Sequence, residues 1–116
     1  MSDSAKKRAA ISGRLAMARK MAGLSQAQVA KLLNLHRPTI SELEAGRRGV
    51  SVEELTKLAE IYGVGLSWLA CTDTDSPNPV KDRLELAARQ LSKLKKADLD
   101  RVIELLTAIG VSRESE

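Results

Sequence analysis

Few side chains in this sequence are of the types that carry out covalent or metal chemistry. The chain has a single histidine, His36, and a single cysteine, Cys71. Nucleophilic catalysis and metal binding need several such groups at defined spacings, and general acid–base catalysis commonly needs paired carboxylates. The sequence shows no such set and no glycine-rich phosphate loop. We therefore expect no enzymatic activity, no cofactor, no metal site and no small-molecule substrate, and one cysteine cannot form an internal disulfide.

Cationic side chains are the more abundant chemistry, and they are concentrated in the first part of the chain. Residues 1–70 contain eleven Lys and Arg against six Asp and Glu, whereas residues 71–116 contain eight against nine. A basic segment joined to a nearly neutral one favours an anionic partner for the basic part. A solvated basic surface would have the same composition, so charge alone leaves both interpretations open.

The elements that hold these side chains are predicted to be helices. Good helix formers dominate, there is no Phe, and apolar residues recur at spacings of three and four. The predicted fold is therefore all-α. The expected helices cover residues 4–22, Ser25 to Asn34, and about 38–45, 52–62, 66–70, 79–95 and 98–109.

Helix ends and inward faces can also be predicted. Ser25 with Gln28, and Ser51 with Glu54, match the capping-box pattern that begins a helix. Gly23, Asn34, Gly46, Gly63 and Gly110 are expected to end helices, because glycine and asparagine tolerate the left-handed conformation. The expected inward residues are Ile11, Leu15, Ala18, Ala22, Val29, Ala30, Leu32, Leu33, Ile40, Leu43, Val52, Leu55, Leu58, Ala59 and Tyr62.

The segment from Leu24 to Arg48 carries a specific geometric pattern. Two helices that cross steeply through a short turn need a small residue where they touch, a left-handed residue in the turn and apolar anchors on the second helix. Ala30 supplies the first, Asn34 the second, and Ile40 with Leu43 the third. These types at these spacings predict a helix-turn-helix.

The sequence here resembles the Cro/C1-type helix-turn-helix repressors, also called the xenobiotic-response-element family, and in particular the DNA-binding domains of lambdoid phage repressors. The resemblance covers residues 14 to about 68. It is carried by Arg14-Leu15 and Arg19, Gly23 to Gln26, Val29-Ala30, Ile40 to Arg48, Leu55, Leu58-Ala59, Gly63-Val64 and Trp68-Leu69. The family implies a five-helix, lambda-repressor-like domain whose third helix, here at about 37–45, lies in the major groove of double-stranded DNA.

The resemblance also implies roles for individual residues. Arg37, Pro38, Thr39 and Glu42 match base-facing positions, where Arg reads guanine and Glu accepts from cytosine N4. Phosphate contacts are expected from Ser25, Gln26 and Ser41, and from Arg47 and Arg48 after the helix. His36 precedes the helix where the family usually has a small residue, and it is also expected to face DNA. Pro38 disfavours helical geometry at Arg37, so the helix could begin one residue late.

Several residues have a structural interpretation beside the functional one. By resemblance, Arg19 and Glu44 form a buried salt bridge between the first and third helices. Trp68 is expected to pack in the core and not to stack on a base. For Lys6, Lys7 and Arg8, an arm on DNA and a solvated helical face both remain open.

The chain is expected to divide into a DNA-binding domain over 1–71, a polar linker over 72–78 and a helical extension over 79–116. The extension is too small for a good core of its own, so we expect it to form a homodimer; a hairpin on the domain's own surface is the alternative. The expected dimer residues are Leu84, Leu91, Leu94, Leu99, Val102, Ile103, Leu106 and Ile109.

Two functional hypotheses follow from this organisation. The first is a dimeric repressor on a palindromic operator, with half-sites one helical turn apart. The second is an antitoxin-type autorepressor whose C-terminal helices bind a toxin protein. No apolar run reaches the ~18 residues of a membrane span, and no apolar region follows the first cations as in a signal peptide. We therefore expect a cytoplasmic protein without a membrane partner.

Overall fold

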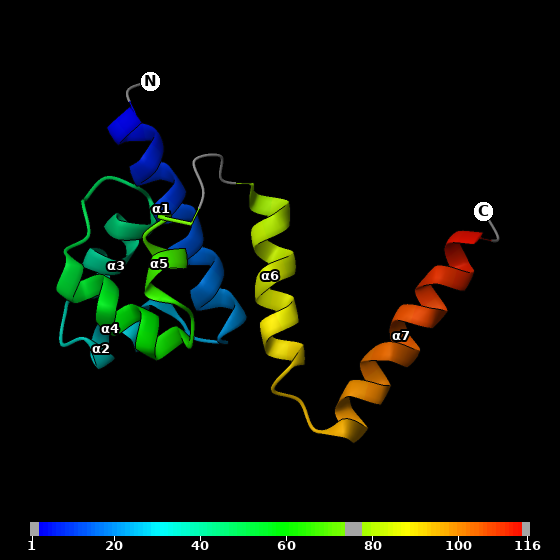
Figure 1. The fold of residues 1–116 in the computed structure, drawn as a ribbon. Coiled ribbons are helices and arrows are strands. Elements are labelled where there is room, and N and C mark those ends of the chain that lie inside the picture. Colours follow the sequence, from blue (N-terminus) through cyan, green and yellow to red (C-terminus); the bar gives the residue numbers. More distant parts are fainter. Residues whose placement is uncertain (1–2, 74–77, 115–116) are drawn as a thin grey trace. The chain divides into compact units, whose positions relative to one another are not determined.

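The computed structural model describes residues 3–73 and 78–114, and these form α-helices and no strand. The helices, coloured along the chain in Figure 1, are α1 (Asp3–Met21), α2 (Gln26–Leu32), α3 (Arg37–Glu44), α4 (Val52–Tyr62), α5 (Leu66–Leu69), α6 (Pro79–Leu91) and α7 (Lys96–Glu114). The chain divides into two compact units, residues 1–84 and residues 85–116. The all-α prediction is confirmed.

The helix ends form as the sequence chemistry predicts. Ser25 Oγ accepts a hydrogen bond from the Gln28 N–H at 3.0 Å, while Gln28 Oε1 accepts one from the Ser25 N–H at 2.8 Å. Ser51 and Glu54 make the same reciprocal pair at the start of α4. Asn34 has a φ of 56°, which lets the chain turn sharply between α2 and α3. Gly46 ends α3 with a φ of 75° and lies so close to Ser12 that an added Cβ would be 3.2 Å from the Ser12 hydroxyl.

The core of the first unit is aliphatic with one tyrosine. Helix α3 packs against α1 and α2, and α1 also packs against α4 and α5. Burial raises the pKa of the Tyr62 hydroxyl. Trp68 lies against the core, as predicted. The buried set is Leu15, Ala18, Val29, Ala30, Ile40, Leu43, Leu55, Leu58, Ala59, Tyr62 and Leu69.

Two residues predicted to point inward are exposed. Leu32 is 61% exposed, because it lies beyond the edge of the stripe formed by Val29, Ala30 and Leu33 on the short helix α2. Val52 is 73% exposed, because it occupies the first position of α4, where no neighbouring element covers it. In both cases the residue type fits a core, but its position on the helix does not.

A charged residue, Arg14, is buried beside this core. The Arg14 side chain is 2% exposed and makes a two-pronged ion pair with Asp82, with Nε and Nη2 each 2.9 Å from a carboxylate oxygen. Its Nη1 donates to Asp73 at 2.6 Å and to the backbone carbonyl of Trp68. The guanidinium carbon also lies 4.7 Å from the centre of the Trp68 ring, within the range of a cation–π contact.

The Arg14 network fastens the beginning of α6 to α1. Burial lowers the pKa of Arg14, but the hydrogen bonds to Asp82 and Asp73 raise it by more, so the guanidinium stays charged. Asn78 caps α6, with Oδ1 accepting from the Val80 N–H at 3.0 Å, and Pro79 occupies the first turn, as predicted. Residues 74–77 of the expected linker lie outside the described residues. Asp73 and Asp82, on either side of them, both contact Arg14.

The second unit contains the end of α6 and the whole of α7. Helix α6 ends at Leu91, earlier than the predicted residue 95, and α7 extends from Lys96 to Glu114. The prediction that Gly110 ends the last helix is wrong. A glycine inside a helix costs about 1 kcal/mol relative to alanine but does not forbid helical geometry. None of the described helices combines the length and apolar character that crossing a bilayer requires.

Arg14→Met is expected to lower the free energy of unfolding by about 3–5 kcal/mol, because Asp82 is left buried and charged without its main partner. Urea unfolding measures this loss. Arg14→Met combined with Asp82→Leu removes both charges and should recover most of it. Lys20→Met, which changes an exposed cation on the same helix, is the control and should stay within about 0.5 kcal/mol of wild type. Equal stability of the Arg14 and Lys20 variants would contradict the prediction.

Asp73 should contribute to stability in a pH-dependent way. The hydrogen bond from Arg14 lowers the pKa of Asp73 below its ordinary value. The contribution is therefore present above the unfolded pKa of about 4 and is lost as the pH falls through the lower folded value. Urea unfolding of wild type and Asp73→Asn from about pH 6 downward tests the sign. The two should differ at pH 6 and converge below about pH 4; a constant difference would show that the charge of Asp73 is irrelevant.

Candidate nucleic-acid interface

Helix α3 is held by its inward face, which leaves the opposite face accessible. Ile40 and Leu43 are both 2% exposed and anchor it in the core. The helix begins at Arg37, as the resemblance implies and one residue before the start at Pro38, with Pro38 in its first turn and His36 as N-cap. The His36 side chain makes no capping hydrogen bond, although its carbonyl accepts from the Thr39 N–H at 2.9 Å. His36, Arg37 and Pro38 are exposed, and Thr39, Ser41 and Glu42 are partly exposed.

Glu44 connects α3 to α1 and to the beginning of α2. Arg19 donates from Nε to Glu44 Oε2 at 2.7 Å and from Nη2 to Oε1 at 2.9 Å. Arg19 Nη1 also donates to the Leu24 carbonyl, which precedes α2. The hydrogen bonds to Glu44 raise the pKa of Arg19 by more than burial lowers it. The exposed fractions of the two side chains, 12% and 8%, make this a largely buried pair.

Gln26, expected at the DNA backbone, also contacts Glu44. Its Nε2 donates to Glu44 Oε1 at 3.1 Å. The amide group therefore has a fixed direction, with one N–H engaged and a second still able to donate. Ser25 is exposed beside it, and its hydroxyl oxygen accepts in the capping box. No local sequence pattern indicates the Gln26–Glu44 bond, because this contact depends on how α2 and α3 cross.

Glu42 and Arg47 form a second two-pronged pair across the end of α3. Arg47 Nε lies 2.8 Å from Glu42 Oε2, and Nη2 lies 3.0 Å from Oε1. The hydrogen bonds from Arg47 lower the pKa of Glu42. Glu42 is therefore an anionic acceptor. Both side chains are more than 40% exposed, at 41% for Glu42 and 62% for Arg47, so water screens the pair and it contributes little to stability.

Arg48 is oriented by the start of α4. Its Nη2 lies 3.0 Å from Glu54 Oε2, and Glu54 Oε1 accepts from the Ser51 N–H at 2.9 Å. Burial raises the pKa of Glu54, but these hydrogen bonds lower it by more, so the carboxylate remains charged. The Arg48 side chain is 43% exposed. Arg47 and Arg48, in the loop after α3, are thus exposed cations, and each has one carboxylate neighbour.

The Arg14 network is the set of interacting residues that sequence reasoning missed. A signal for it exists: Arg14 lies on the same helical stripe as Ile11, Leu15 and Ala18, which all pack in or against the core. A cation at that angular position on the helix faces the core and therefore requires a buried partner. The sequence does not say which acidic residue supplies it. In the described part of the chain no three His, Cys, Asp or Glu side chains gather as metal ligands would.

Comparison with known families gives one match. The family model described as Helix-turn-helix, the Cro/C1 type, matches residues 15–69, from the middle of α1 to the end of α5. Comparisons with curated proteins and with solved structures gave no match. The matched segment contains both the α2–α3 turn and the Arg19–Glu44 pair. Residues 15–69 are thus matched as a Cro/C1-type helix-turn-helix domain, and this match supports a DNA-binding transcriptional regulator.

Proposed function

We propose that the protein is a dimeric repressor that places two copies of α3 in adjacent major grooves of a palindromic operator. The observation that carries the proposal is the polar face of α3, which is exposed on a helix fixed from behind by Ile40, Leu43 and Glu44. A helix that reads bases must be rigid, because a small displacement changes which side chain meets which base.

On this proposal the exposed residues divide between base reading and phosphate binding. Arg37, Pro38, Thr39 and Glu42 face base edges, with Arg37 donating to guanine and anionic Glu42 accepting from cytosine N4. Phosphate binding is assigned to residues within α3 or on either side of it in the sequence, which are Ser25, Gln26, His36, Ser41, Arg47 and Arg48. These contacts position the helix without reading the sequence.

The dimer proposal rests on the apolar face of α7. Ile103, Leu106 and Ile109 recur at spacings of three and are about half exposed, at 50%, 57% and 49%. The other expected dimer residues are also accessible: Leu84 and Leu94 are exposed, and Leu91, Leu99 and Val102 are partly exposed. A second copy would remove this surface from water, at about 25 cal/mol per Å² of apolar area.

Arg37→Ala is expected to weaken specific binding by about 1–3 kcal/mol and to relax the preference at one base pair in each half-site. The wild-type operator is first selected from random duplexes. The affinity of each variant is then measured by fluorescence anisotropy at one salt concentration. Lys57→Ala removes an exposed cation from α4, outside the proposed interface, and should bind like wild type. An Arg37→Ala variant with unchanged sequence preference would remove Arg37 from the base-reading set.

Leu106→Asp is expected to shift the full-length protein from dimer to monomer, because it adds a charge to the proposed interface. Sedimentation equilibrium measures the mass, and binding to the selected palindrome should fall towards that of a single half-site. Ala108→Asp adds the same charge to another exposed position of α7, on the opposite side of the helix, and should stay dimeric. A point variant is preferable to truncation after residue 72, which would also remove the Asp73 and Asp82 partners of Arg14.

The antitoxin hypothesis makes a different prediction in the same experiment. If α7 binds a toxin protein and dimerisation occurs elsewhere, Leu106→Asp stays dimeric and retains full operator affinity. That result would redirect the search to a protein partner of α7, while DNA binding by α3 would stand.

A further inference from the structure

A groove lies between α1 and the loop that follows α3. Its volume is about 270 Å³, and it is lined by Ser4, Lys7, Arg8, Ile11, Ser12, Leu15, Leu43, Arg48, Gly49 and Val50. Leu43 belongs to α3 itself, and Arg48 and Gly49 come directly after Arg47 in the loop. The groove therefore shares Arg48 with the proposed DNA-binding face, whereas its Leu43 is on the buried side of α3.

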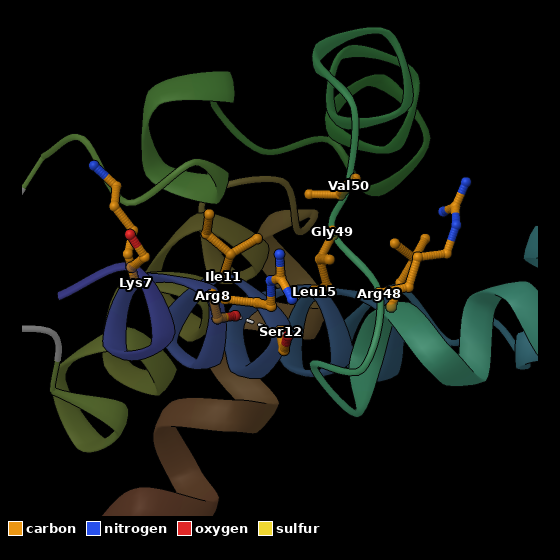
Figure 2. Close-up of a pocket in the computed structure, with 10 residues that line it drawn as sticks. Lys7, Arg8, Ile11, Ser12, Leu15, Arg48, Gly49 and Val50 are labelled. Carbon is orange, nitrogen blue, oxygen red and sulfur yellow. Dashed lines mark hydrogen bonds between the residues drawn. The ribbon is translucent and has the colours of Figure 1, made fainter. Parts of the chain in front are cut away.

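The charge of the groove has one sign. Three of its lining residues are cations, Lys7, Arg8 and Arg48, and none is acidic. Arg48 already has Glu54 as a neighbour at 3.0 Å. In the described part of the chain, no ion pair is found for Lys7 or Arg8. Figure 2 shows Arg8 between α1 and the loop at Gly49, while Lys7 and Arg48 extend outward at the two ends.

The position of Arg8 depends on two small residues. Arg8 Nη2 lies 3.4 Å from the point that a Cβ at Gly49 would occupy, so the guanidinium fills the space next to a residue without a side chain. On α1, the buried Ser12 hydroxyl donates to the Arg8 carbonyl at 2.8 Å, one turn away. The guanidinium thus lies against the loop backbone, and its side chain is exposed to an incoming ligand.

The apolar part of the groove identifies the class of ligand. The partly exposed Ile11 and Val50 form an apolar wall beside the cations, whereas Leu15 and Leu43 are 2% exposed and belong to the core. An inorganic anion would leave that wall uncovered. A nucleic-acid backbone offers a phosphate to the guanidinium and a sugar to the apolar wall, and it is already next to the groove if α3 binds DNA.

We propose that this groove binds the sugar–phosphate backbone of operator DNA just outside the base pairs that α3 reads, with Arg8 as its principal phosphate contact. The proposal rests on the proposed function, and it extends the footprint of each subunit from the helix-turn-helix to the first turns of α1. The proposal also assigns Arg8 to a DNA contact and not to a solvated helical face.

The test compares two duplexes that carry the selected operator. One ends at the outermost base pair read, and the other continues for about five base pairs, half a helical turn, at each end. Wild type should bind the longer duplex about tenfold more tightly, with a steeper salt dependence, because each subunit neutralises one more phosphate. Arg8→Gln should lose this gain, and its salt slope on the longer duplex should be smaller by about two for the dimer.

Three controls make the outcome specific. Arg8→Lys keeps the charge and should retain most of the gain, and Lys57→Gln removes an exposed cation from α4 and should retain all of it. Thermal unfolding of Arg8→Gln should match that of wild type. If it does not, Lys7→Gln provides a second neutralisation in the same groove, with a smaller expected loss of the same sign.

The two proposals fail in different ways. If the wild-type protein selects no operator and binds all duplexes equally, the proposed function is wrong, and the groove proposal is overturned with it. If wild type binds the short duplex specifically but gains nothing from flanking DNA, only the groove proposal is overturned. It is also overturned if Arg8→Gln keeps the gain, or if it weakens binding to both duplexes equally.

Discussion

The hydrogen bonds accepted by the Glu44 carboxylate are the interactions on which the geometry of the proposed DNA-binding face depends. The carboxylate accepts from Arg19 on α1 through two hydrogen bonds and from the Gln26 amide at the start of α2. One side chain on α3 thereby fixes the orientation of α3 relative to both preceding helices. A largely buried ion pair contributes little net stability compared with apolar packing, but it tolerates only one arrangement of its hydrogen bonds. Ile40 and Leu43 supply the burial that holds α3 in place, and Glu44 determines its direction.

Arg14 performs the corresponding task between α1 and the segment that follows α5. The DNA-binding family match ends at residue 69, yet the partners of Arg14 are Asp73 and Asp82 beyond that limit. The interior of the matched domain is therefore incomplete without the start of α6. Removal of both aspartates would leave the buried guanidinium with only the Trp68 carbonyl as a hydrogen-bond partner among the described residues. The segment after α5 therefore contributes to the stability of the domain.

Much of this structure could be predicted from local chemistry. Ser25, Ser51 and Asn34 fix helix ends through groups within three residues of each other, and apolar spacing located most of the core. Prediction failed where angular position or length mattered more than residue type, as at Leu32, Val52 and Gly110. It also failed for the partner of Arg14, which is 68 residues away in sequence at Asp82. The α3 residues were identified as candidates by resemblance, but the pairing of Glu42 with Arg47 depends on the path of the chain after Gly46.

That pairing links base reading to phosphate binding on the proposed interface. The exposed Glu42–Arg47 pair is weak enough for a phosphate to displace the carboxylate, and it holds the Arg47 side chain extended, which reduces the entropy lost on binding. Once displaced, Glu42 remains an anion beside a polyanion, because an exposed glutamate is ionised at neutral pH. A cytosine N4 amino group within reach donates a hydrogen bond to Glu42. A base edge that offers only acceptors gives the Glu42 carboxylate no hydrogen bond and repels it. Discrimination at Glu42 would then come mainly from the penalty against wrong bases, and that penalty would be largest when Arg47 is bound to DNA.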